Sequence, residues 1–163
     1  MNITLTLDGV LRTPTGTPNR IGRDLFHALE RDNTLYVLTT DHNADARRWL
    51  QLNQFYGWAQ LLTIPHTENG RSPDAQRAHR NDRHIEFIQS IRHELHLDLA
   101  IEADPDIAAG LLRHGLPTVL TTHPAFSHPL HRPDHDRTPT PWDNLKKAIE
   151  EDRLTTAPNS EDD

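Results

Sequence analysis

Apolar and polar positions alternate at the start of the chain and later follow a helical period. Ile3, Leu5 and Leu7 alternate with polar residues before the pair Asp8-Gly9, a pattern typical of a strand that ends in a tight turn. Apolar positions three or four residues apart then indicate helices between short apolar runs. The pattern predicts strands near 3–7, 34–40, 59–65, 97–103 and 116–122, and helices near 20–32, 44–55, 74–95 and 104–115.

The alternation of strands and helices predicts a fold of the α/β class, with an open parallel sheet and helices on both of its faces. The side chains that the first helix is expected to bury are Ile21, Leu25, Phe26 and Leu29. The second helix follows a short polar stretch, in which Asp41 or Asn43 is expected to act as the N-cap.

After residue 122 the sequence changes character. Residues 123–141 contain five Pro and four His, which indicates an irregular segment, and an amphipathic helix is expected after it. We therefore predict three parts. These are an α/β domain over residues 1–125, a Pro- and His-rich extension with a C-terminal helix over 126–155, and a disordered acidic tail over 156–163.

Composition and charge limit the classes of protein to which this chain can belong. The chain has 163 residues, which suits one domain with a hydrophobic core. Its net charge is −7 and the excess of acids lies mostly in residues 150–163, so no nucleic-acid surface is expected. No apolar run approaches the roughly 20 residues of a membrane span, so we expect no membrane insertion and predict a cytoplasmic location. The chain has no Cys, which excludes disulfides, thiolate zinc sites and cysteine nucleophiles.

Polar side chains gather where the predicted strands end, and ligands of open parallel sheets bind at that edge. Asp8 follows the first strand, Thr39 and Thr40 end the second, and Glu102 ends the fourth. Two carboxylates and a hydroxyl at one edge suit a hard cation such as Mg²⁺ and a phosphate group held against it.

Four short motifs in this order resemble those of the haloacid-dehalogenase-like (HAD) superfamily, whose phosphatases use an Asp nucleophile. Residues 6–11 (TLDGVL) are similar to the first motif, Asp-x-Asp-Gly, from Asp8 onward, and residues 37–40 (VLTT) are similar to the second. A basic residue on the helix before the fourth strand corresponds to the third. Residues 99–124 resemble the fourth, an acidic cluster after an apolar strand. The resemblance covers residues 1–125 and implies a HAD-like, Rossmann-like fold with little or no cap domain.

The resemblance also implies roles for individual residues. Asp8 takes the position of the general acid/base. The residues expected to bind phosphate are Thr39 or Thr40 on the second strand and Arg83, Arg80 or Arg77 on the helix before the fourth. The expected ligands of a weakly bound Mg²⁺ are Asp8, Glu102 and Asp104.

Thr6 departs from the family pattern, because the nucleophilic Asp is expected at that position. A Thr hydroxyl is a poor nucleophile without an adjacent base, and it gives a cation one negative ligand fewer. The sequence therefore predicts a degenerate phosphatase homologue, inactive or impaired, that acts by binding a small phosphorylated ligand or a protein partner. One alternative is a Mg²⁺-dependent phosphatase or nucleotidase that acts on a small phosphomonoester. The other is a structural or assembly protein, because the chain is similar to small HAD-like proteins of phage genomes; its location is then the host cytoplasm.

Each candidate also has a purely structural interpretation. Asp8 can form the turn after its strand, and Glu102 can pair with a neighbouring Arg. The basic residues can lie on one solvated helix face, and Asp104 can cap the following helix. In the extension, the candidate metal ligands are His123, His128, His131 and His135, with Asp134 and Asp136 nearby. The oligomeric state is left open.

Overall fold

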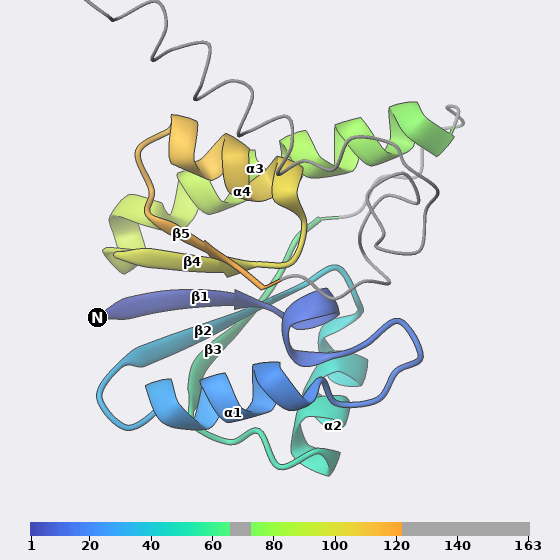
Figure 1. Cartoon of the computed structure of the whole chain (residues 1–163), viewed down its shortest axis with the longest axis vertical. Helices are drawn as coiled ribbons and strands as arrows, with labels where there is room; N and C mark the ends of the chain where they lie inside the picture. The colour runs from blue at the N-terminus through green and yellow to red at the C-terminus, as the bar shows by residue number, and fades with distance from the viewer. Residues whose placement is uncertain (66–72, 122–163) are drawn as a thin grey trace, which may run out of the picture. The chain divides into compact units, whose positions relative to one another are not determined.

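The structure is a computed structural model that describes residues 1–65 and 73–121, with side chains in the second range described from residue 78 onward (Figure 1). The chain divides into two units, Met1–Phe126 and Ser127–Asp163, and all described residues belong to the first. The predicted extension and C-terminal helix, the candidate histidine ligands and the acidic tail lie outside the described residues.

Five strands form a single parallel sheet with the order β3-β2-β1-β4-β5 (Figure 1). The strands are β1 (Asn2–Thr6), β2 (Thr34–Thr39), β3 (Trp58–Thr63), β4 (Leu99–Glu102) and β5 (Thr118–Leu120). The first strand is central and pairs with β2 on one side and β4 on the other, and every neighbouring pair is parallel. The predicted α/β class with a parallel, Rossmann-like sheet is confirmed.

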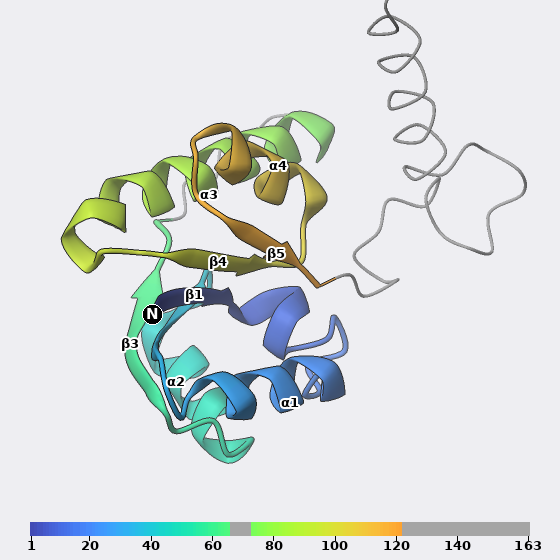
Figure 2. The ribbon, with the colours of Figure 1, turned by 60° about the vertical axis from the view of Figure 1, so that its left-hand side comes forward.

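Helices cover both faces of the sheet. They are α1 (Arg20–Leu29), α2 (Asn43–Leu52), α3 (Pro73–Leu95) and α4 (Pro105–Arg113). The helices α1 and α2 lie against one face and α3 and α4 against the other, as the turned view in Figure 2 shows. The chain leaves β1 toward β2 and β3, and then crosses to the other side of the sheet for β4 and β5. Within the described ranges, no helix has both the length and the apolar character needed to cross a membrane.

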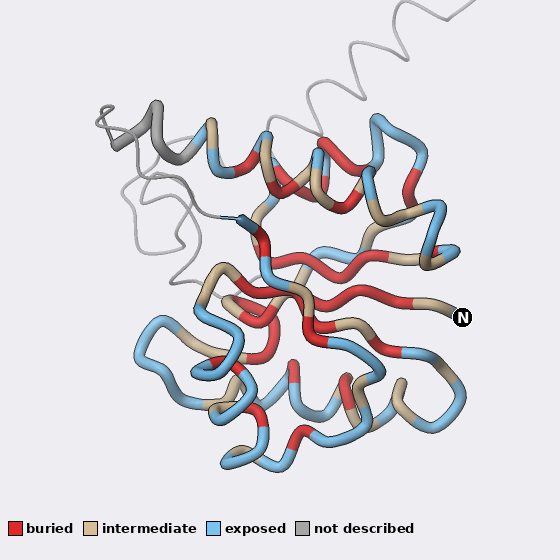
Figure 3. The backbone as a smooth tube through the Cα atoms, turned by 180° about the vertical axis from the view of Figure 1, so that it is seen from behind, coloured by how far each residue is buried: buried red, intermediate tan, exposed pale blue. Residues whose placement is uncertain are grey.

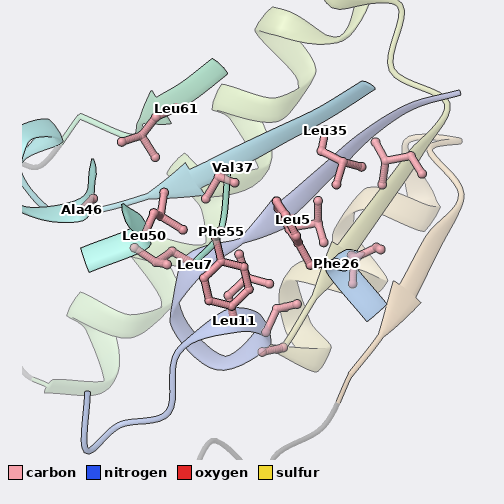
Figure 4. Packing of buried hydrophobic residues seen from close by; sticks show 14 residues of the cluster. Leu5, Leu7, Leu11, Phe26, Leu35, Val37, Ala46, Leu50, Phe55 and Leu61 are labelled. Carbon is pink, nitrogen blue, oxygen red and sulfur yellow. The ribbon is translucent and has the colours of Figure 1, made fainter. Parts of the chain in front are cut away.

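Two hydrophobic cores lie on opposite faces of the sheet, and the buried stretches of β1, β2 and β4 lie between them (Figure 3). Under α1 and α2, the aromatic rings of Phe26 and Phe55 meet edge to face, with centroids 5.1 Å apart, beside Leu5 and Leu35 of the strands (Figure 4). The core under α3 and α4 is built from Leu38, Ile64, Ile88, Leu97, Ala100, Ile107, Leu111 and Leu116. Burial on both faces explains why β2 and β4 read as apolar runs.

The first helix buries a narrower stripe than its sequence predicts. Phe26 is fully buried, and Leu25 and Leu29 pack partly buried against the same core. Ile21 is 69% exposed, so the expectation that it belongs to the core is wrong. The buried positions of α1 are Gly22 and Phe26, so the buried stripe begins at Gly22 and Ile21 lies outside it.

A tight turn, η1 (Leu7–Leu11), follows β1 and positions the start of α1; the Arg12 N–H closes it by donating to the Leu7 carbonyl at 2.8 Å. Gly9 has a φ of 90° inside this turn, a backbone conformation that favours glycine. Asn19 joins the turn to the helix, because its Nδ2 donates to the Gly9 carbonyl at 3.2 Å and its Oδ1 accepts from the Ile21 N–H at 3.2 Å. The helix therefore starts directly against the turn that carries Asp8.

Gly22 is the contact point between α1 and this turn, and its replacement by Ala is expected to destabilise the protein. A Cβ at Gly22 would lie 1.8 Å from the Val10 carbonyl oxygen and 2.7 Å from its carbon. Backbone atoms cannot rotate away, so we expect Gly22→Ala to lower the free energy of unfolding by about 2–3 kcal/mol. Urea denaturation followed by circular dichroism measures this change.

Gly110→Ala is the matched control, because Gly110 is also a buried helical glycine. There the nearest atom to an added Cβ is Cδ1 of Ile85, at 2.2 Å, which is the mobile end of a side chain. Ala also favours a helix over Gly by about 1 kcal/mol, so the net loss is expected to stay below about 1 kcal/mol. Equal losses for the two variants would contradict the proposed backbone contact.

Candidate functional site

The candidate site lies at the carboxyl ends of β1, β2 and β4. Because Leu5 pairs with Ile101 in parallel register, Thr6 and Glu102 come next to each other at the end of adjacent strands. On the other side Thr6 pairs with Leu38, so Thr39 follows at the same edge. The register of the central strand thus brings together residues that are far apart in the sequence.

Glu102 forms the buried half of the site. Its side chain is 1% exposed, and it accepts a hydrogen bond from the Thr6 hydroxyl at 2.6 Å on Oε2. Its other oxygen, Oε1, lies 3.2 Å from Nε2 of His84, which is also buried. A buried carboxylate needs such partners. They are a hydroxyl and an imidazole, so the expectation of a neighbouring Arg is wrong for the described residues.

Arg12 forms the second, more exposed half of the site. Its Nη2 lies 2.7 Å from Oδ1 of Asp8 and 2.5 Å from Oδ2 of Asp41, and its Nε donates to Asp8 at 2.8 Å. Its guanidinium carbon lies 5.6 Å from the ring centroid of Trp49, within the range of a cation–π contact. One guanidinium therefore joins the turn after β1 to the end of β2.

The surroundings of Arg12 also stabilise its charged form. Burial lowers the pKa of the guanidinium, and the hydrogen bonds to Asp41 and Asp8 together with their negative charges raise it by more. The pKa of Arg12 consequently lies above its usual value. An arginine is charged at every physiological pH in any case, so this part of the site holds a permanent positive charge.

Thr39 and Asp41 have structural roles at the end of β2. The Thr39 side chain is buried, and its hydroxyl accepts a hydrogen bond from the Asp41 backbone N–H at 3.0 Å, which directs the turn that carries Asp41 toward Arg12. Thr40 is half-buried. The predicted N-cap of α2 is wrong: His42 occupies that position without a side-chain cap bond, and Asn43 is the first helical residue. Asp41 is unavailable as a cap because its carboxylate binds Arg12.

On α3 the residue that reaches the site is His84 rather than a basic residue. Arg80 is exposed, Arg83 is half-buried and makes an interaction of its own, and the Arg77 side chain lies outside the described part. His84 was missed because His occurs often in this chain. A signal was nevertheless present, since His84 lies four residues before Ile88 on the apolar stripe of the helix.

Asp104 caps the helix that follows it, which is the structural interpretation of this residue. Its Oδ1 accepts from the Asp106 backbone N–H at 2.9 Å, and it is the N-cap of α4. Among the described residues no group of three His, Cys, Asp or Glu side chains could hold a metal ion. The carboxylates of Asp8 and Glu102 are held by different protein groups, Arg12 for Asp8 and Thr6 with His84 for Glu102. Metal binding at Asp8, Glu102 and Asp104 stays a prediction.

No family model matches the sequence, and no curated protein matches it either. The functional interpretation therefore depends on the geometry of the site and on the resemblance of the motifs. The roles predicted for Thr39, Thr40, Arg80 and Arg83 in phosphate binding likewise stay predictions.

The hydroxyl of Thr6 is expected to contribute to stability, whereas that of Thr4 on the same strand is expected to reduce it. Thr6 donates to a buried carboxylate, so Thr6→Val is expected to cost about 1.5–3 kcal/mol. The Thr4 hydroxyl is buried and has no hydrogen-bond partner in the described part of the chain. Thr4→Val is therefore expected to stabilise the protein by about 1 kcal/mol.

Chemical denaturation of the two variants and the wild type measures both changes in the free energy of unfolding. Both substitutions are Thr→Val on the same strand, so each serves as the control for the other. Opposite signs are the expected result. An undiminished stability of Thr6→Val would show that the bond between Thr6 and Glu102 contributes nothing, and a loss of stability in Thr4→Val would contradict the cost assigned to its unpaired hydroxyl.

Proposed function

We propose that this protein is a HAD-like phosphatase homologue that has lost phosphate-ester turnover and acts by binding a partner or ligand at the carboxyl edge of its sheet. The observation that carries the proposal is the pairing of its acids. Asp8 and Asp41 bind Arg12, and Glu102 binds Thr6 and His84. Each carboxylate at the edge is thus already occupied by a group of the protein itself.

The contact between Thr6 and Glu102 supports the loss of turnover. In the resembled family the position of Thr6 holds a nucleophilic Asp that also binds the metal. Here the neutral hydroxyl at this position donates to Glu102 at 2.6 Å, and the opposite oxygen of Glu102 faces His84. The residue at the nucleophile position and the acid at the end of β4 therefore bind each other rather than a shared cation.

The charge of the edge bears on the kind of ligand. Among the described residues that bind one another at this edge, Asp8, Asp41 and Glu102 bring three carboxylates, and Arg12 brings one guanidinium, which binds two of them. A phosphate dianion at this place would meet an excess of negative charge without a bound cation to offset it. This favours a protein partner that brings hydrogen-bond donors over a small phosphorylated ligand.

One observation favours the alternative of a working phosphatase. A Thr hydroxyl needs an adjacent base to act as a nucleophile, and Oε2 of Glu102 lies at hydrogen-bond distance from Thr6. A carboxylate that accepts the proton of an attacking hydroxyl is an established arrangement in phosphoryl transfer. The two functions are separated by direct assay.

We expect the wild-type protein to hydrolyse an aryl phosphate with Mg²⁺ no faster than its Asp8→Asn variant. We also expect Thr6→Asp to stay inactive, because it would place a second carboxylate against Glu102, and two carboxylates in contact cannot both ionise. Initial rates of p-nitrophenol release measure both. Wild-type turnover that Asp8→Asn abolishes would overturn the proposal.

Thr6→Asn is the control for the shape of Thr6→Asp, since it lacks the added charge. Circular dichroism of each variant shows that it is folded before its rate is interpreted. Turnover in Thr6→Asp alone would show that the site decayed only at the nucleophile position and still assembles a metal.

The charge argument predicts that inorganic phosphate does not bind at this edge. In ¹H–¹⁵N spectra, phosphate titrated at constant ionic strength is expected to leave the backbone amides of residues 6–12 and 39–41 unchanged. Shifts of those amides in the wild type would instead favour a phosphorylated ligand. Chloride at the same ionic strength provides the control for general salt effects.

A further inference from the structure

Asn81 is a buried polar side chain of α3 that takes no part in the contacts of Glu102 or Arg12. It is 7% exposed, and the described side chains of α3 that are buried are Asn81, His84 and Ile88. Positions three and four residues apart lie on one face of a helix. Because Ile88 belongs to the hydrophobic core and His84 lies against Glu102, Asn81 is on the side of α3 that faces the sheet.

The direction of α3 places Asn81 at the carboxyl edge of the sheet. The helix lies between the end of β3 and the start of β4 and runs against the direction of the strands, as Figure 1 shows. Residues earlier in α3 are therefore closer to the carboxyl ends of the strands. Asn81 precedes His84 by three residues, which is about 4.5 Å along a helix axis. Since His84 contacts Glu102 at the end of β4, Asn81 lies about one turn farther toward this edge.

Within the part of the chain that the structure describes, the side-chain amide of Asn81 has no hydrogen-bond partner. Asn2, Asn33 and Asn53 are more exposed, and yet Nδ2 of each donates to a backbone carbonyl, at 2.7, 2.9 and 2.8 Å. A buried amide without partners destabilises a protein. A donor and an acceptor left open in this way at the ligand-binding edge indicate a bound group that supplies both partners.

We propose that Asn81 binds a neutral amide group of the partner at the carboxyl edge of the sheet. The inference rests on the proposed function and deepens it, because it names the group that the partner brings. An Asn side chain offers one acceptor oxygen and an NH₂ donor, which match the N–H and C=O of another amide. A primary amide presents these two on the same side, and so does one residue of an extended peptide backbone.

The carboxylate of Glu102 determines which ligands fit beside Asn81. Glu102 is 1% exposed and accepts a hydrogen bond from Thr6. A carboxylate or phosphate on the ligand would bring a like charge close to it in surroundings that water screens poorly, which is unfavourable. A neutral amide brings no charge and pairs both polar atoms of Asn81. The site therefore selects an amide over an anion.

Replacement of the unpaired amide is expected to stabilise the free protein. Asn81→Leu keeps the branching at Cγ and removes both polar atoms, so we expect a rise of about 2–4 °C in the melting temperature. Asn33→Leu is the matched control, because Asn33 has the Leu29 carbonyl as its partner, and its melting temperature is expected to fall. A fall in Asn81→Leu and also in Asn81→Ala, which adds no volume, would overturn the inference.

Binding is measured in ¹H–¹⁵N spectra of the full chain, titrated with two neutral probes. Acetamide presents the amide of an Asn or Gln side chain, and N-acetylglycine N-methylamide presents one residue of a peptide backbone. We expect weak binding, of millimolar affinity at best for ligands of this size, that shifts the NH₂ signals of Asn81 and the backbone amides of residues 81–84. The side-chain signals of Asn33 and Asn53 are the internal control, since their donors already bind carbonyls.

In Asn81→Leu the backbone amides of residues 81–84 are expected to lose this response, and sodium acetate at the ionic strength of a NaCl reference is expected to leave them unchanged in the wild type. The probe with the larger shift identifies the source of the amide, side chain or backbone. Equal responses of wild type and Asn81→Leu, acetate shifts as large as those of acetamide, or no response to either neutral probe would overturn the inference. None of the probes is a phosphate ester. Turnover of an aryl phosphate would thus contradict the proposed function alone, and absence of amide binding would contradict this inference alone.

Discussion

The buried carboxylate of Glu102 needs hydrogen-bond partners, and the arrangement of β1, β4 and α3 depends on this need. A carboxylate with 1% of its surface exposed requires hydrogen-bond donors, because an unpaired buried charge costs several kcal/mol. Its partners come from two other elements: the Thr6 hydroxyl of β1 donates to it, and Nε2 of His84 on α3 lies 3.2 Å from its other oxygen. The backbone carbonyl of Glu102 also accepts from the Thr121 N–H at 2.8 Å. The end of β4 thus fixes the positions of its neighbouring strands and of the helix above it.

The second half of the edge is organised by a cation, the Arg12 guanidinium. Arg12 binds Asp8 and Asp41 and lies over Trp49, so it joins the turn after β1 to the start of the α2 segment. The two halves divide the acids of the edge between them. In a metal-dependent hydrolase the acids of the site bind one shared ion. In this protein each acid instead binds side chains of the protein, Arg12 in one half and Thr6 with His84 in the other.

Most of the fold was predictable from the sequence because it follows from local patterns. Alternation of strands and helices was sufficient for the parallel sheet, and the long helix expected near 74–95 is observed as Pro73–Leu95. The exposure of Ile21 was not predictable in this way, since periodicity shows which side a residue faces but not where the helix meets the sheet. Helix ends also differ, and α1 stops at Leu29 rather than near residue 32.

The site was predictable only in its location. Strand ends identified Asp8, Thr39 and Glu102, but not their partners, because pairing depends on contacts between distant segments. Arg12 belonged to a loop rich in Pro and Gly, where the sequence gives no period. Its spacing of four residues from Asp8 was the one local signal. The expectation that Asp41 caps α2 was wrong for the same reason. Its carboxylate binds Arg12, a contact that outweighs the local preference of Asp for the start of a helix.

The joining of Asp8, Arg12 and Asp41 by one side chain has a consequence for how this protein can change during evolution. Replacement of Arg12 leaves two carboxylates without their cation, whereas replacement of either acid leaves a one-to-one ion pair, so the first change carries the larger cost. Loss of Arg12 while both acids persist places two like charges close together, so this loss is expected to be tolerated better after one of the acids has been replaced. In homologous sequences these three positions are therefore expected to vary together.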